Sequence, residues 1–310
     1  RSFRQSYFLY SFLRDPMAIG SFIVVLLLAS AGILAPVIAP HNPYDTKTID
    51  IMDSEIPPSW MEGGETRFLL GTDSQGRDML STILYGTRVS IVIGLGAVDL
   101  QSLLGVLIGL IAGYAGGRVD AFLMRVADVQ LSFSTYMVAI FLGAILRTLV
   151  GVGMYAEVAV PFLILVIGIA EWPQYARTVR ASVLAEKKME YVEAARVIGL
   201  PSARIMWRHI LPNTMTPVLV ISTVQVANAI MSEAALSFIG LGMPVARPSL
   251  GSLIKIGFEY IFSGSWWITL FPGVVLVLLI LAINLLGDWL LDFLNPKLYK
   301  NLRGIYQCPP

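Results

Sequence analysis

The stretch EYVEAARVIGLPSARIMWRHILP, residues 190–212, is a charged and polar interruption between two long hydrophobic segments. Good helix formers fill residues 186–197, and Gly199 is well placed to end that helix in a left-handed backbone conformation. Glu193 would then lie in about the last turn, where the helix macrodipole disfavours an anion, so we expect a compensating contact. The two alanines after Glu193 carry little bulk, which would let another backbone or domain approach closely.

A second short helix is predicted in the other half of this stretch. Pro201 suits the first turn of a helix over residues 201–210, because its missing N–H is not needed there. Pro212 would end that helix, and Asn213 could cap the hydrophobic segment that follows. The interruption therefore reads as two helices joined by a turn at Gly199, within a longer polar segment over residues 173–213.

The composition on either side points to a membrane. Of 310 residues, 56% are hydrophobic and only 14% are charged, which is more apolar surface than one soluble core needs. A net charge of +1 argues against a nucleic-acid partner, and the single Cys308 cannot form an internal disulfide. Helical runs of about 20 residues cross a bilayer, and we place six at 17–39, 89–113, 126–149, 156–172, 214–239 and 267–291. These predict an all-α integral membrane protein with about six transmembrane helices.

Lys and Arg mark the cytoplasmic side of such a protein. They collect in the segment 173–213 and in the tails 1–16 and 292–310, at Arg177, Arg180, Lys187, Lys188, Arg196, Arg204, Arg208, Arg1, Arg4, Arg14, Lys297, Lys300 and Arg303. The loop 40–88 is instead rich in Asp and Glu, which places it outside, where it is either a plain linker or a structured motif. Both termini are then cytoplasmic, and residues 89–291 form the transmembrane core. The run 17–39 exceeds a signal-peptide core of about 7–15 residues, so we expect a retained helix.

Ionisable residues inside the spans are costly and are candidates for function. Asp99, Asp128 and Glu233 are the three that we identify. Asp128 is more simply explained by a local pair with Arg125 on the same helix face, and Glu233 by helix packing rather than by substrate contact. His41 and His209 fall on opposite sides of the predicted membrane, so no metal site is expected. No nucleophile with a base is evident, and we expect no catalysis in this chain.

The loop also carries a specific pattern. Glu193-Ala194-Ala195, Gly199 and His209-Ile210-Leu211-Pro212 have the spacing of the EAA loop and resemble type I ABC importer permeases. Further matches resemble the C-type permease of dipeptide and oligopeptide importers, at Leu70-Gly71-Thr72-Asp73, Gly76-Arg77-Asp78, Trp172, Tyr175-Ala176-Arg177, Arg180 and the stretch 232–242. One departure is Ser134, where relatives often have proline, so the kink of the third span lacks its proline.

The resemblance implies a permease that works with a second permease subunit, one or two ABC ATPase subunits and an external substrate-binding protein in a bacterial inner membrane. ATP and Mg would bind to the partners, with no cofactor in this chain, which contains no glycine-rich phosphate loop. The coupling residues implied are Glu190, Glu193, Ala194, Ala195, Gly199, Arg204, Arg208, His209 and Pro212. Relatives carry dipeptides, oligopeptides, glutathione, nickel chelates or peptide antibiotics, and no residue here selects among them.

Other classes of membrane protein stay open at this point. From physical chemistry alone, the loop could be an amphipathic helix resting on lipid head groups. An ion-coupled carrier or channel would use Asp99, Asp128 and Glu233 as its ion path without ATP, although no inverted repeat is evident. A passive scaffold with a lipid-binding helix would show no ATP turnover that depends on substrate.

Overall fold

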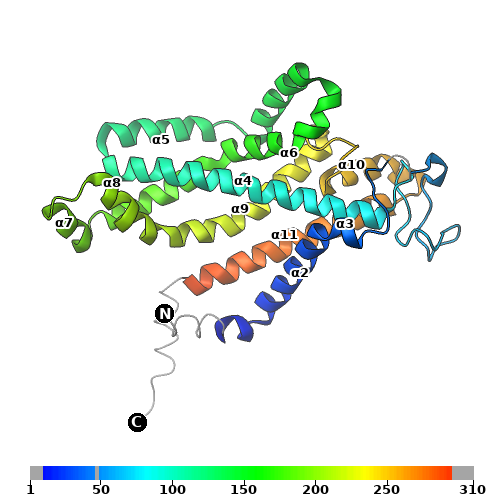
Figure 1. The fold of residues 1–310 in the computed structure, drawn as a ribbon, viewed down its shortest axis with the longest axis horizontal. Helices are drawn as coiled ribbons and strands as arrows, with labels where there is room; N and C mark the ends of the chain where they lie inside the picture. The colour runs from blue at the N-terminus through cyan, green and yellow to red at the C-terminus, as the bar shows by residue number, and fades with distance from the viewer. Residues whose placement is uncertain (1–9, 46–48, 295–310) are drawn as a thin grey trace, which may run out of the picture.

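Long helices that run roughly along one axis make up the architecture (Figure 1). The computed structural model describes residues 10–45 and 49–294, and within them β pairing is confined to an isolated bridge between Thr72 and Asp78. The long helices are α2 (Pro16–Ile33), α4 (Met79–Ala115), α6 (Thr135–Glu186), α9 (Leu211–Ile239) and α11 (Trp267–Leu294). The shorter elements are α3 (Ala35–Ile38), α5 (Gly117–Leu131), α7 (Glu190–Val197), α8 (Ser202–Ile205), α10 (Leu250–Tyr260), a π-helical segment (Met206–Ile210) and 3-10 turns at Ile51–Asp53 and Ile261–Ser263.

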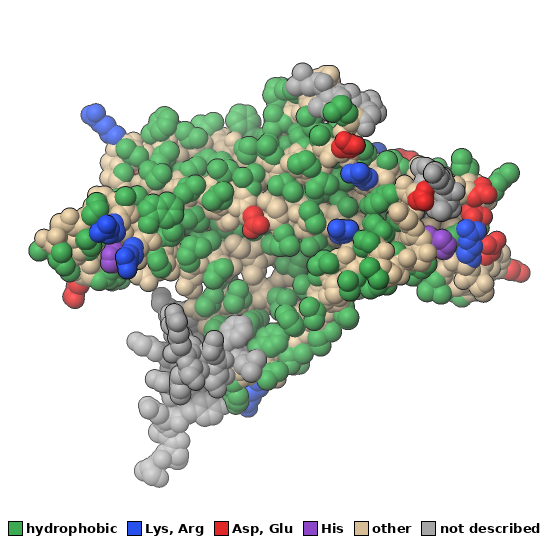
Figure 2. All heavy atoms as spheres, viewed as in Figure 1, with side chains coloured by type: hydrophobic (Ala, Val, Ile, Leu, Met, Phe, Trp, Pro, Cys, Tyr) green, Lys and Arg blue, Asp and Glu red, His purple; other side chains and the backbone are tan. Residues whose placement is uncertain are grey.

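These helices include enough apolar length for about six membrane crossings. Five described helices qualify singly, with mean hydropathy between 1.4 and 2.6, and the bent pair Gly117–Leu131 and Thr135–Leu146 supplies a sixth. Figure 2 shows hydrophobic side chains over most of the middle of the molecule and charged ones mainly at its two ends. Lipid around the middle and water at the ends would select this distribution. The predicted all-α membrane fold is confirmed, while the basic tail residues other than Arg14 lie outside the described residues.

The third and fourth spans differ from the predicted boundaries. The third was expected over 126–149, but it begins at Gly117 in α5 and bends by 81° before Thr135. The break lies at Ser132–Ser134, where Ser134 has an extended backbone, so the chain kinks without a proline. The fourth was expected over 156–172, but α6 continues to Glu186 through Pro173. Neighbouring helices make a proline tolerable in a membrane helix, which is why Pro173 does not end α6.

Helix α4 lies at the centre and packs closely against α6. Gly105, Gly109 and Gly113 recur every four residues and form one face of α4. A Cβ atom at Gly109 would come 2.5 Å from the carbonyl oxygen of Ala176 in α6, so only glycine fits here. Stripes of small residues let membrane helices approach in this way. Helix α4 also starts ten residues before the predicted span 89–113, with Asp78 capping it by accepting from the Ser81 N–H at 2.9 Å.

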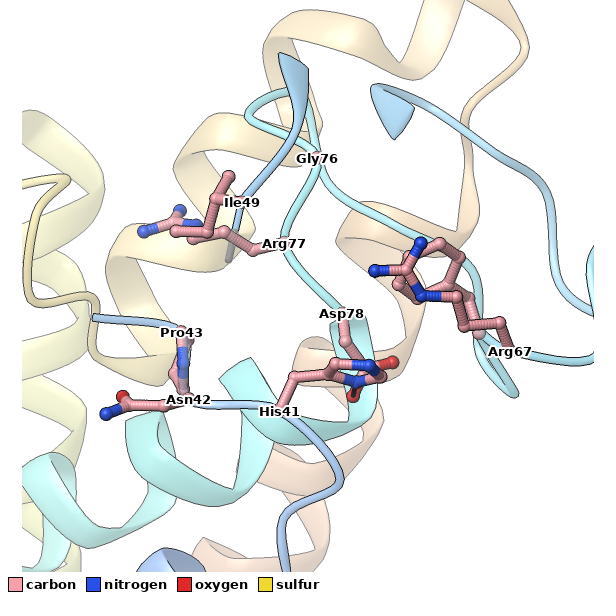
Figure 3. Close-up of a pocket in the computed structure, with 9 residues that line it drawn as sticks. His41, Asn42, Pro43, Ile49, Arg67, Gly76, Arg77 and Asp78 are labelled. Atoms are coloured by element: carbon pink, nitrogen blue, oxygen red, sulfur yellow. Dashed lines mark ion pairs between the residues drawn. The ribbon is translucent and has the colours of Figure 1, made fainter. Parts of the chain in front are cut away.

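The outer loop between α3 and α4 is a fixed structure rather than a plain linker. Asp73 and Arg77 form a buried ion pair at 2.6 Å, and Arg77 Nη1 donates to the carbonyl of Val245 at 2.8 Å. Trp267 Nε1 donates to the carbonyl of Thr72 at 3.1 Å, which ties the loop to the start of α11. The cavity beside His41 (Figure 3) has a volume of about 10 Å³, which is room for about one water molecule and too small for a metabolite.

Candidate functional site

The predicted coupling residues lie together at one end of the molecule, opposite the outer loop (Figure 1). Glu190, Glu193, Ala194 and Ala195 are on α7, Gly199 is in the turn after it, Arg204 is on α8, Arg208 and His209 are in the π-helical segment, and Pro212 is in the first turn of α9. The structure therefore brings the EAA pattern into one compact loop. Its two helices, α7 and α8, connect the end of α6 to the π-helical segment that leads into α9.

The first helix of the loop begins later than expected. Residues 187–189 form a turn, and α7 starts at Glu190 with Met189 as its N-cap. Glu193 thus lies in the first turn, so the prediction that it lies in the last turn was wrong. The macrodipole favours an anion at this end by about 0.3–1 kcal/mol at an exposed position. No compensating contact is needed, and the carboxylate is exposed.

The end of α7 follows the predicted glycine cap. Gly199 has φ +83°, in the left-handed region, and its N–H donates to the Arg196 carbonyl at 2.9 Å. The Leu200 N–H donates to the Ala195 carbonyl at 3.1 Å. This pair of bonds is a Schellman motif, which satisfies the last carbonyls of a helix and fixes the direction of the chain after it.

The second half of the loop does not end at its proline. Helix α8 passes into the π-helical segment Met206–Ile210, and that segment continues directly into α9. The Leu211 N–H donates to the Met206 carbonyl, a wider register that places Pro212 in the first turn of α9, where a proline costs little. Pro212 therefore starts a helix rather than ending one. Asn213 is not a cap; its Nδ2 donates to the His209 carbonyl at 3.1 Å and to the Tyr191 hydroxyl at 2.9 Å.

One face of α7 packs against the rest of the chain, and the opposite face is exposed. Val192 is fully buried, and Ala195 is 5% exposed, both within the core cluster that includes Ile205 and Ile210. Glu190, Glu193, Ala194 and Arg196 are exposed on the other side. Two apolar side chains at the tip, Val197 and Ile198, are 88% and 77% exposed. Our sequence reasoning missed this pair, although two β-branched residues directly before a cap glycine in a charged loop are a usable signal.

Side-chain contacts fasten α7 to three long helices. The Tyr191 hydroxyl donates to Glu186 at the end of α6 and accepts from Asn213 in α9. Burial and the hydrogen bond to Glu186 raise the pKa of Tyr191, so this hydroxyl keeps its proton at neutral pH. The Lys187 ammonium donates to the backbone carbonyl of Tyr114 near the end of α4. The guanidinium of Arg196 lies 5.8 Å from the centroid of the aromatic ring of Tyr114. Sequence reasoning missed Tyr191 and Tyr114.

The charged residues of the spans have different partners from those predicted. Asp128 pairs with Arg177 of α6 at 2.6 Å, so the predicted pair with Arg125 was wrong. Arg125 and Asp128 share a helix face, but α6 lies beside α5 and offers the cation Arg177 across the helix interface. A second pair joins the same helices, because Arg180 makes two hydrogen bonds to the carboxylate of Asp120, at 2.5 and 2.6 Å.

Glu233 lies inside this chain. Its side chain is fully buried and accepts from Ser90 of α4 at 2.9 Å and from Ser237 at 2.6 Å. The Ser90 hydroxyl also accepts from the Leu250 N–H at 3.4 Å, so this group connects α4, α9 and α10. Glu233 thus packs helices together, as its predicted structural role requires, and its pathway role stays a prediction.

Other polar groups occur along the middle of the spans. Asp99 is exposed on α4, and its pathway role also stays a prediction. Glu171 of α6, which sequence reasoning missed, accepts from Thr135 at 3.3 Å and from Gln225 of α9 at 3.2 Å. In residues 10–45 and 49–294 no three His, Cys, Asp or Glu side chains are grouped to hold a metal. The two histidines lie at opposite ends of the molecule (Figure 2).

Comparison with known sequences identifies the family. Residues 105–300 match the family of binding-protein-dependent transport system inner membrane components, and residues 4–58 match the N-terminal TM domain of oligopeptide transport permease C. The Di/tripeptide transport system permease protein DppC of Pseudomonas aeruginosa is 38% identical over 291 residues, covering 94% of this chain and 91% of that protein. Dipeptide transport system permease protein DppC of Escherichia coli K12 is also 38% identical, with 94% and 92% covered.

Comparison with solved structures supports the same fold. A chain of the MetNI methionine ABC transporter in an inward-facing conformation superposes with a TM-score of 0.56 at 17% identity, covering 70% of this chain and 98% of that one. The loop geometry, the helical spans and the family matches agree with one another. This multi-pass inner membrane protein has the type I ABC importer permease fold and belongs to the family of binding-protein-dependent transport system inner membrane components.

Proposed function

We propose that this chain forms half of the translocation pathway of an ATP-driven importer of short peptides. The partners are a second permease subunit, one or two ABC ATPase subunits and an external substrate-binding protein. ATP and Mg²⁺ bind to the ATPase subunits, and this chain holds no cofactor. The peptide substrate is supported by the relatives named above, which are permeases of dipeptide and di/tripeptide transport systems.

The observation that carries the proposal is the form of α7. Its inner face is buried against the bases of α6 and α9, and its outer face presents Glu190, Glu193, Ala194 and the apolar tip Val197–Ile198 to an open side. Exposed apolar residues in a charged setting mark interaction surfaces. An ATPase subunit seated on this face can move α7 as its nucleotide state changes.

The orientation of the chain in the membrane is part of the proposal. The end with α7 is cytoplasmic, as are both termini, and the outer loop 40–78 faces the substrate-binding protein. The accumulation of Lys and Arg near α7 and of Asp and Glu in the outer loop supports this sidedness. Figure 1 is consistent with it, since α2 begins and α11 ends toward the side on which α7 lies.

Charge reversal on α7 tests the coupling role. Glu193→Lys, in the full importer with its ATPase subunits, should abolish co-purification of the ATPase and peptide uptake. Glu65→Lys makes the same charge change at an exposed position of the outer loop and should leave ATPase association intact. Association and uptake at wild-type levels in Glu193→Lys would refute the coupling assignment.

Transport without ATP tests the ion-coupled alternative. An ion-coupled carrier or channel would move substrate or ions in liposomes that hold this chain alone, without partners or ATP. Our proposal requires that such liposomes take up no peptide. Uptake by them would refute the importer mechanism.

A further inference from the structure

A cavity of about 340 Å³ lies beside α10. Helix α10 lies toward the outer end of the molecule, away from α7 (Figure 1). Its walls come from α6, from α10 and from the end of α9 with the connection that follows it. They are Tyr155, Ser237, Gly240, Met243, Pro244, Val245, Ser252, Lys255, Ile256 and Glu259. Ligand pockets usually span about 300–1,000 Å³, so this one suits a small molecule.

The walls of this outer pocket are held in place by buried contacts. Tyr155 is 5% exposed, and its hydroxyl donates to the carbonyls of Leu241 and Gly242 at 3.1 and 3.0 Å. The Met243 N–H donates to the Ser237 hydroxyl at 3.0 Å, which fixes the connection between α9 and α10. The pocket is therefore formed before any ligand arrives, and little binding energy is lost in ordering it.

The outer pocket contains one cation and one anion on the same helix face. Lys255 and Glu259 are four residues apart on α10, yet neither takes part in the ion pairs found among residues 10–45 and 49–294. The Lys255 ammonium lies against the end of α9, since a Cβ atom at Gly240 would come 2.6 Å from Nζ. The ammonium therefore lies at the wall of the pocket, where the C-terminal end of the α9 dipole stabilises it.

We propose that the outer pocket is a binding site for the two charged ends of a short peptide, which it receives at the outer end of the pathway. Lys255 pairs with the peptide carboxylate, Glu259 with the peptide ammonium, and Met243, Val245 and Ile256 contact a side chain. Two extended residues span at most about 7 Å, which is close to the roughly 5–6 Å between the Cβ atoms of residues four apart on a helix. This inference rests on the proposed peptide substrate.

Protection from chemical labelling tests occupancy directly. Val245→Cys, in a Cys308→Ser background, places one thiol in the pocket wall of the assembled importer. A dipeptide with free termini should slow maleimide labelling. The same dipeptide with an amidated C-terminus should give equal protection only at a concentration at least about tenfold higher, because it cannot form the charge-assisted hydrogen bond to Lys255.

Substitutions of the charged pocket residues give a second test in the same labelling assay. Lys255→Met should raise the half-protecting concentration of the free dipeptide at least about tenfold, Lys255→Arg should restore it, and Glu65→Gln on the outer loop should not change it. Equal protection by free and amidated dipeptide, or loss of assembly with the second permease in Lys255→Met, would overturn the inference. The comparison of peptides needs no charge variant, so a misfolded variant does not block it. Peptide uptake that persists without protection would overturn only this inference, whereas a wild-type importer that takes up no peptide would refute the proposed function.

Discussion

One methyl group added at Gly109 tests whether α4 and α6 pack as closely as the structure requires. In Gly109→Ala the new Cβ would lie 2.5 Å from the Ala176 carbonyl oxygen and 2.9 Å from Cβ of Val179. Ordinary contact between heavy atoms begins at about 3.5 Å, so the helices must separate by about 1 Å. A gap of that size forfeits about a quarter to a half of the dispersion energy across the affected contacts. Overpacking of this kind costs about 1–3 kcal/mol.

A matched control separates this clash from the change of residue type. At Gly20 in α2, a methyl group would meet no atom within 4 Å, so Gly20→Ala adds the same group without a clash. Alanine is a better helix former than glycine by about 1 kcal/mol in water, so this control should keep or raise stability. The two substitutions are therefore expected to act in opposite directions.

Thermal unfolding of the purified permease in detergent measures the difference. A loss of about 1 kcal/mol shifts the midpoint by about 2–4 °C in a chain of 150–250 residues, so Gly109→Ala should unfold about 2–12 °C below the Gly20→Ala control. Gly20→Ala should unfold at or above the wild-type temperature. A midpoint for Gly109→Ala equal to or above that of Gly20→Ala would refute the close packing of α4 on α6.

Three further results are expected. Gly199→Ala should destabilise the end of α7 by about 1 kcal/mol, because φ +83° disfavours a Cβ, and Gly199→Asn should cost less. Limited proteolysis of the loop measures both variants, and equal rates of cleavage in Gly199→Ala and wild type would contradict this prediction. Asp128→Asn should cost at most about 1 kcal/mol because its ion pair is half exposed, while Asp120→Asn should lower the unfolding midpoint further, since two hydrogen bonds to Arg180 are weakened. Tyr191→Phe should keep ATPase co-purification but lower uptake per ATP several-fold, and unchanged uptake per ATP would show that its hydrogen bonds do not couple.

Long hydrophobic runs and charge-rich loops were enough to predict the membrane class and the number of spans. Those signals are large, because every apolar residue of a span contributes to them. The glycine cap at Gly199 was also predictable, since a left-handed position after a helix strongly selects glycine. The residues of the motif from Glu193 to Pro212, together with their spacing, then gave the resemblance to the family.

Break points and partners within the spans were not predictable in the same way. The 81° bend before Thr135 has no glycine or proline to mark it, and it depends on how α5 and α6 pack. Asp128 has a cation on its own helix and another on α6, and only the tertiary arrangement chooses Arg177. Pro212 reads as a stop when hydrogen bonds are assumed to be α-helical, but the π register before it changes which N–H groups need partners.

Within the described residues, a series of side-chain contacts joins α7 to the outer end of the molecule. Tyr191 ties α7 to α6 and α9, and Glu171 accepts from Gln225 to join those two helices again at mid-length. Glu233 then links α9 to α4 and α10. Packed interfaces shift between discrete arrangements rather than bending continuously. A displacement of α7 should therefore move α6, α9 and α10 together, which places the gate of the proposed importer between this chain and its partner permease rather than within this chain.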